Sequence, residues 1–115
     1  MSESLFGIHG AALELRSHRM GLIASNIANA ATPGYKARDL DFASALEARL
    51  SGQSVGEAAG QAGVFRVPLM PSLDGNTVET GTEQTAFAEN ALGYSASLEF
   101  VRGRVNMITR ALRGE

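Results

Sequence analysis

The chain has 115 residues, of which 44% are hydrophobic but only 6% aromatic, with 13 glycines and a formal net charge of -2. This length suits a single domain, and an apolar content made largely of alanine and aliphatic residues favours helix-on-helix packing. The small negative charge gives no general attraction to nucleic acids or anionic membranes, and the lack of cysteine excludes disulfides and thiolate metal sites.

The first residues, MSESLFGIHGAAL, carry Glu3 where a secretory signal peptide has basic residues, and they lack a continuous apolar stretch before a cleavage site. We therefore expect no cleaved signal peptide of the general secretory type. No run approaches 18 apolar residues, so we also expect no membrane-spanning helix.

The first predicted helix covers residues 5–31, where two rows of residues recur with helical spacing. One row alternates steps of three and four, as in a heptad seam: Leu5, Ile8, Ala12, Leu15, Arg19, Leu22, Asn26 and Asn29. The other repeats every seven residues on another side: Phe6, Leu13, Met20 and Ile27. One further long helix does not cover both sides, so we favour partner chains over a centrally buried helix.

The helix ends at Thr32-Pro33-Gly34, because proline has no backbone donor and glycine tolerates a positive φ. Asn26 and Asn29 precede this break on the packing side, where an amide without hydrogen-bonding partners is unfavourable. We expect both amides to bond the turn of residues 32–35 and an adjacent helix, and so to fix the direction in which the chain leaves the core.

Residues 32–41 are predicted to form a turn segment that leads into a short helix over 42–50, with Asp39 or Asp41 as its N-cap. Residues 51–81 are predicted to be a flexible loop, because their first part is small, polar and rich in glycine. Within the loop, residues 64–70 read as an edge strand or extended arm, limited by Pro68. Asp74-Gly75-Asn76 predicts a turn.

The last predicted helix covers residues 82–113 and has the clearest pattern. Its apolar row is unbroken: Phe87, Ala91, Tyr94, Leu98, Val101, Val105, Ile108 and Leu112. We expect this row to pack on Leu5, Ile8, Leu15 and Leu22. The predicted fold is therefore mainly α, with two long terminal helices in a coiled-coil-like hairpin and a short helix and irregular loop or β-arm between them. Gly93 and Gly103 suggest close approach of another backbone.

Chemical sites are weakly supported. His9, His18 and Glu14 supply too few ligands at useful spacing for a metal site, and a solvated i,i+4 contact of the last two is the better interpretation. The glycines near residue 60 lack the lysine of a phosphate-binding loop. We expect no catalytic residue, cofactor, metal or bound nucleic acid. Arg19 lies in the seam, and we expect it to pair with a carboxylate such as Glu89 or Glu99.

Two regions of the sequence resemble a known family. Residues 26–36 resemble the N-terminal signature of bacterial flagellar basal-body rod and hook proteins, and the heptad helix over residues 83–112 resembles their second mark. The matching residues are Asn26, Ile27, Ala28, Asn29, Thr32, Pro33, Gly34, Tyr35 and Lys36; Ala31 stands where many relatives have an acid. Residues 36–42, residues 74–79 and the pair Asn90 and Tyr94 look most like a proximal rod protein.

The resemblance implies a structural subunit of the flagellar rod that transmits torque and lines the export channel. Implied partners are other rod subunits, copies of itself, and the export gate and MS-ring side of the basal body, without membrane insertion. The implied location is the periplasmic rod, reached through the flagellar type III apparatus without a cleaved signal peptide. The alternatives are another short rod protein, a cytosolic coiled-coil adaptor, which leaves the Thr-Pro-Gly-Tyr-Lys break unexplained, and a small metal enzyme.

Overall fold

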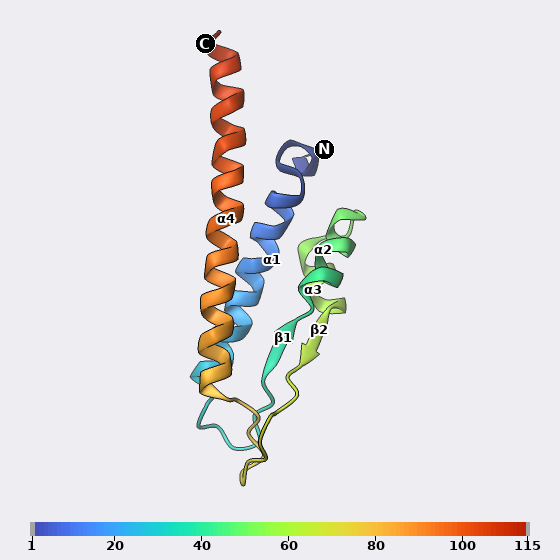
Figure 1. Cartoon of the computed structure of the whole chain (residues 1–115). Coiled ribbons are helices and arrows are strands. Elements are labelled where there is room, and N and C mark those ends of the chain that lie inside the picture. Colours follow the sequence, from blue (N-terminus) through green and yellow to red (C-terminus); the bar gives the residue numbers. More distant parts are fainter. Residues whose placement is uncertain (1, 115) are drawn as a thin grey trace.

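The structure, a computed structural model, describes residues 2–114, and side chains over residues 6–114. Figure 1 shows two long helices side by side, with a smaller arm against one of them. The elements in chain order are α1 (Ser2–Ala28), β1 (Arg38–Leu40), α2 (Phe42–Leu50), α3 (Val55–Gln61), β2 (Gly63–Phe65) and α4 (Thr80–Arg113). The molecule measures 64 × 25 × 18 Å. The predicted fold, mainly helical with paired terminal helices, is confirmed.

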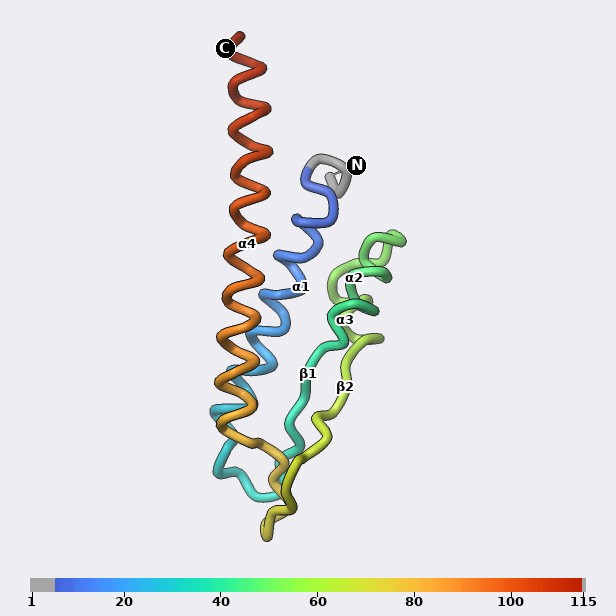
Figure 2. Tube along the Cα trace, in the orientation of Figure 1, coloured from blue at the N-terminus to red at the C-terminus, as the bar shows by residue number. Residues whose placement is uncertain are grey.

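The terminal helices run antiparallel. Asn26 near the end of α1 bonds Glu83 near the start of α4, whereas the ring of His9 stacks on Phe100 at 4.2 Å, far along α4. Beyond this level α1 bends, because Gly7 has a non-helical φ of 60°. The C-terminal part of α4 extends past α1 and the arm, as Figure 2 shows.

The row of α4 that faces α1 is not the predicted one. Its fully or nearly buried members are small or polar: Glu83, Ala86, Asn90 and Ser97. The last three each precede a member of the apolar row by one position, which is about 100° around the helix. Phe87 and Tyr94 remain 44% and 37% exposed beside this contact. The apolar row therefore borders the intramolecular contact and does not form its centre.

The hydrophobic core lies on the other side of α1. It consists of Leu15, Leu40, Ala45, Ala59 and Ala62, with Leu22 among the side chains packed against it. The seam of α1 thus contacts the arm, so the arm and α4 together cover more of α1 than one long helix would. The expectation that partner chains cover the second row stays a prediction. What stays partly exposed is the second row, represented by Phe6 and Ile27.

The arm is more ordered than the sequence predicts. β1 and β2 pair antiparallel, with Leu40 opposite Gly63. The predicted edge strand therefore exists but is short, and it begins one residue earlier. The predicted flexible loop is wrong over α3, whose N-cap Ser54 accepts a hydrogen bond from the backbone N–H of Glu57 at 3.1 Å. A serine three residues before a glutamate is the capping-box spacing.

The remaining seam residues vary in exposure. Ile8, Val105 and Leu112 are exposed, whereas Ala91, Leu98, Val101 and Ile108 are intermediate. The side chain of Leu5 lies outside the described residues. None of the described helices has an apolar stretch long enough to cross a membrane.

Candidate functional site: the signature turn and the junction cluster

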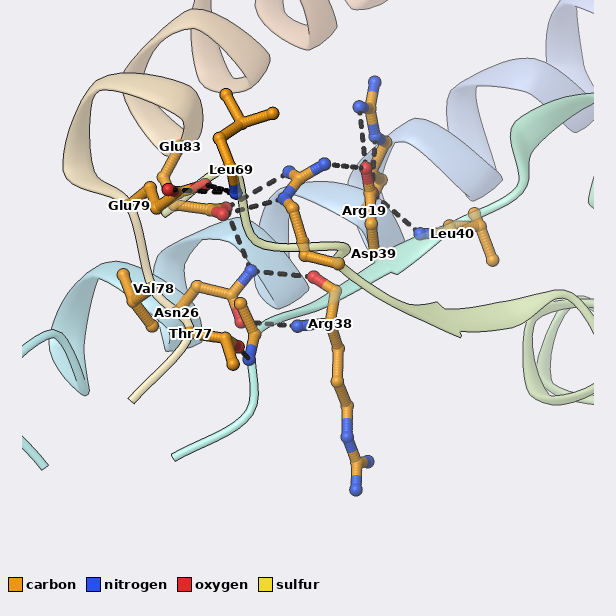
Figure 3. Close-up of polar contacts among 12 residues, drawn as sticks. Arg19, Asn26, Arg38, Asp39, Leu40, Leu69, Thr77, Val78, Glu79 and Glu83 are labelled. Carbon is orange, nitrogen blue, oxygen red and sulfur yellow. Dashed lines mark hydrogen bonds and ion pairs between the residues drawn. The ribbon is translucent and has the colours of Figure 1, made fainter. Parts of the chain in front are cut away.

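Asn26 occupies the point where α1, β1 and α4 meet, and it is fully buried. Its Nδ2 donates to the carbonyl of Arg38 at 2.7 Å and to Oε1 of Glu83 at 2.9 Å. Its Oδ1 accepts from the N–H of Arg38 at 3.0 Å and from the hydroxyl of Tyr35 at 3.4 Å. Figure 3 shows the bonds of Asn26 to Arg38 and Glu83. The expectation that Asn26 bonds both the turn and an adjacent helix is confirmed.

Asn29 has a more local role. Its Nδ2 donates to the carbonyl of Ser25 at 2.8 Å, and its Oδ1 accepts from the hydroxyl of Thr32 at 3.0 Å. Among the described residues its side chain bonds no other helix, so that half of the expectation is wrong. Asn29 shapes the exit from α1 but does not join it to α4.

The carbonyls of the turn that follows α1 are bonded by Asn76, which is buried. Its Nδ2 lies within hydrogen-bonding distance of the carbonyls of Asn29, Ala30 and Thr32, at 2.9, 3.1 and 2.8 Å. These carbonyls lie just beyond the last helical residue, Ala28, so this donor holds the chain's exit from α1 in place. The sequence marked Asn76 only as a turn residue; nothing local in it pointed to a partner more than forty residues away.

We call residues 32–36 the signature turn, and it interlocks with the turn at residues 74–77. Gly34 adopts a φ of 74°, as only glycine does readily. Besides the bond from Asn76 to the carbonyl of Thr32, three hydrogen bonds join the two turns: Gly34 N–H to Asp74 O at 2.9 Å, Thr77 N–H to Tyr35 O at 2.9 Å, and Lys36 Nζ to Gly75 O at 2.6 Å. The family-like motif is therefore built jointly by two distant segments.

Several signature residues present side chains to solvent. Ile27, Thr32, Pro33 and Lys36 are exposed, whereas Tyr35 is partly buried against Ser25, with 3.1 Å between their hydroxyls. The turn thus has an inner side bonded to the fold and an outer side that is exposed, although the side chains of Thr32 and Lys36 also bond Asn29 and Gly75.

A chain of four charged side chains crosses the same junction. Arg19 on α1 binds Asp39 on β1 through two contacts of 2.8 and 3.0 Å. Arg66, which follows β2, bridges Asp39 at 2.7 Å and Glu83 on α4 at 2.7 and 3.2 Å. We call these four residues with Asn26 the junction cluster. It ties α1, the arm and α4 together by charge-assisted bonds.

The charges in the cluster alternate and compensate one another. Burial by itself raises the pKa of Asp39, but the hydrogen bonds and charge of Arg19 and the charge of Arg66 hold that pKa below its ordinary value. The hydrogen bond to Glu83 chiefly raises the pKa of Arg66. Removing one member leaves an uncompensated buried charge, which is strongly unfavourable. The cluster therefore fixes the arm against the helix pair.

Two sequence expectations need correction here. Arg19 pairs with a carboxylate as predicted, but with Asp39 and not with Glu89 or Glu99. Asp39 is accordingly not the helix cap; Asp41 caps α2, accepting from the N–H of Ser44 at 3.3 Å. A carboxylate within a short strand, as at Asp39, and one that precedes a helix, as at Asp41, look alike in sequence.

A second group of contacts joins α1 and α4 midway along the helix pair. Nδ2 of Asn90 donates to the carbonyl of Arg16 at 2.9 Å, and the guanidinium of Arg16 lies over the ring of Phe42 at 4.2 Å. A Cβ atom at Gly93 would overlap that guanidinium. The absence of a side chain at Gly93 thus makes room for the guanidinium of Arg16, and not for another backbone as the sequence predicted. At Gly103 a Cβ atom would meet no described atom within 4 Å.

The arrangement binds and positions chain segments. Glu14 pairs with Arg49 at 3.3 Å and His9 stacks on Phe100, so these two candidates for metal binding are engaged elsewhere. Over the described residues no three metal-ligating side chains come together. The chemistry available at the junction is hydrogen bonding and charge pairing.

Residues 7–36 match the family of flagella basal body rod proteins. The chain is 47% identical to the flagellar basal body rod protein FlgB of Cereibacter sphaeroides over 95% of its own length and 94% of that protein. It is 41% identical to FlgB of Aeromonas hydrophila, over 98% and 96% of the two chains. It is 40% identical to FlgB of Escherichia coli, over 89% and 88%. The similarity spans the junction cluster and both long helices.

Proposed function

The chain belongs to the FlgB family of flagellar basal body rod proteins, and from this premise we propose that it builds the proximal part of the rod. It is a structural, non-enzymatic protein of the rod, where it assembles with other rod components. The proposal goes further in naming its neighbours as copies of itself, other rod subunits, and the export gate and MS-ring side of the basal body.

One observation carries the proposal beyond family membership. The contact between α1 and α4 buries small and polar side chains, while apolar rows of both helices stay partly exposed, as at Phe87, Tyr94 and Ile27. Exposed apolar rows of this length are unfavourable in a free monomer and typical of a surface that a partner covers. A rod subunit supplies such partners on several sides.

The stiffness expected of a torque-transmitting part has a source in the fold. α4 runs over 34 residues without a described break, and the junction cluster joins the arm to both helices through paired charges. We propose that such subunits surround and line the export channel. Transport through the flagellar type III apparatus without a cleaved signal peptide, to a periplasmic rod, remains part of this proposal.

The outer side of the signature turn is the proposed contact with neighbouring subunits. Thr32, Pro33 and Lys36 are exposed there, on a backbone that Asn76 and the junction cluster hold in place, and Ile27 is exposed in the last turn of α1. A surface that is rigid before binding loses little conformational entropy on assembly.

The test is deletion of the gene, followed by electron microscopy of isolated basal bodies and complementation with the wild-type chain. We expect basal bodies without a complete rod, restored by complementation. Normal rods in the deletion strain would contradict the proposal. Location of a tagged chain only in the cytosol of flagellated cells would favour the adaptor, and location elsewhere along the rod would favour another short rod protein.

A further inference from the structure

Charges on α4 are segregated along its length. All its carboxylates precede Phe100 and all its arginines follow it: Glu83, Glu89 and Glu99 on one side, Arg102, Arg104, Arg110 and Arg113 on the other. Glu83 is already paired with Arg66 in the junction cluster, whereas Glu89 is exposed. Arg104, Arg110 and Arg113 have no ion pair among the described residues. The helix α4 therefore has an acidic first half and a basic last third.

The apolar row of α4 consists of two halves with the same spacing. Phe87, Ala91, Tyr94 and Leu98 follow steps of four, three and four. Val101, Val105, Ile108 and Leu112 follow the same steps, each 14 residues later. Two α4 helices displaced by 14 residues, about 21 Å at 1.5 Å per residue, therefore bring matching apolar rows together.

Both halves of the row are accessible. In the first half α1 occupies the neighbouring row of Asn90 and Ser97, so Phe87 and Tyr94 remain partly open. In the last third α1 has ended, and Val105 and Leu112 are 43% and 85% exposed. One α4 can thus hold its own α1 and a second α4 at once.

We propose that the basic last third of α4 in one copy of the chain docks, in parallel orientation, on the acidic first half of α4 in a second copy. The displacement is 14 residues. Val101 then meets Phe87 and Leu112 meets Leu98, while Arg102 and Arg104 lie at the level of Glu89. This inference rests on the proposed function and gives its contacts a surface and a register.

Other registers are less favourable. With no displacement, arginines lie beside arginines. With a displacement of seven, Arg102 and Arg104 lie at the level of Ser95 and Ser97, where no acid is present. An antiparallel pair, in which Leu112 meets Phe87, also matches apolar rows and opposite charges. Such a pair is two-fold symmetric and closes on itself, whereas a displaced parallel contact repeats from copy to copy, as a rod requires.

The absence of native cysteine permits a direct test by disulfide formation. Two alleles, Leu98→Cys and Leu112→Cys, are expressed together in the deletion strain, and basal bodies are oxidised and analysed without reductant. The matched control replaces Leu98→Cys by Phe87→Cys, so that only the partner position changes. We expect a cross-linked dimer from the first pair, at least tenfold more abundant than from the control or from either allele alone.

The outcomes separate the two proposals. A dimer mainly from Phe87→Cys with Leu112→Cys, or no dimer in basal bodies that contain the chain, overturns the register while the rod assignment stands. Absence of the wild-type chain from basal bodies overturns the rod assignment itself. If the cysteine alleles do not assemble, Arg102→Glu with Arg104→Glu should abolish assembly and added Glu89→Arg should restore it; failure to restore overturns the inference.

Discussion

Replacing Asn26 by leucine is the sharpest test of the junction. The substitution removes four hydrogen bonds and leaves the N–H and carbonyl of Arg38 and one oxygen of Glu83 without this partner. Each buried group left unpaired costs about 1–3 kcal/mol, and burying the leucine returns about 2 kcal/mol. Arg38 as a residue is exposed, and its two bonds to Asn26 are only partly buried, so we expect a net loss of about 2–4 kcal/mol in the free energy of unfolding.

Asn29→Leu is the matched control, because over the described residues the side chain of Asn29 bonds only Ser25 and Thr32, in exposed contacts. Its expected loss is about 0.5–1 kcal/mol. The assay is urea unfolding of the purified chain followed by circular dichroism, with swarming of complemented cells as the functional measure. Equal stability of the two variants, or an Asn26→Leu chain as stable as wild type, would refute the view that Asn26 holds the junction.

Two further predictions concern the turn after α1 and charge. Asn76→Ala should lower the free energy of unfolding by about 1–2 kcal/mol, because the carbonyls of the turn after α1 lose their donor. Asn106→Ala, on the exposed face of α4, should change the free energy of unfolding by less than about 0.5 kcal/mol, and similar losses in the two variants would contradict this role of Asn76. The folded-state pKa of Asp39 lies below its ordinary value. Its contribution to stability is therefore present above about pH 4 and lost as the pH falls through the folded pKa. Unfolding of Asp39→Asn at stepped pH should show a smaller loss of free energy of unfolding below pH 4 than unfolding of the wild type. Parallel curves of free energy against pH for the two chains would contradict this contribution of Asp39.

The junction cluster also explains why a rod subunit holds charges in its interior. A buried ion-pair chain adds little net stability, but it penalises every arrangement in which its members are separated. Arg66 reaches both Asp39 and Glu83, so a shift of the arm along α1 breaks at least one pair. The cluster therefore specifies one placement of the arm, and with it the outer side of the signature turn.

Some predictions were wrong or incomplete because they depended on contacts between residues that are distant in sequence. Arg66 and Glu83 lie far from the signature in sequence, and no periodicity links them to Asn26. The helix α3 was missed because glycine and polar residues masked a capping box at Ser54. The apolar row of α4 was predicted to pack on α1. Heptad spacing indicates that a row is buried, but it does not indicate which segment buries it.

The sequence by itself determined the two long helices, the break at Thr32-Pro33-Gly34, the family and the structural role, because these depend on local periodicity, backbone restriction and a contiguous motif. Only the tertiary structure decided that α4 turns its small and polar row to α1 and leaves its apolar row outward. Two heptad rows one residue apart are equally regular along the chain. The choice between them was made by Asn90 reaching the backbone of Arg16 and by Gly93 admitting its guanidinium, contacts that exist only once the helices pack.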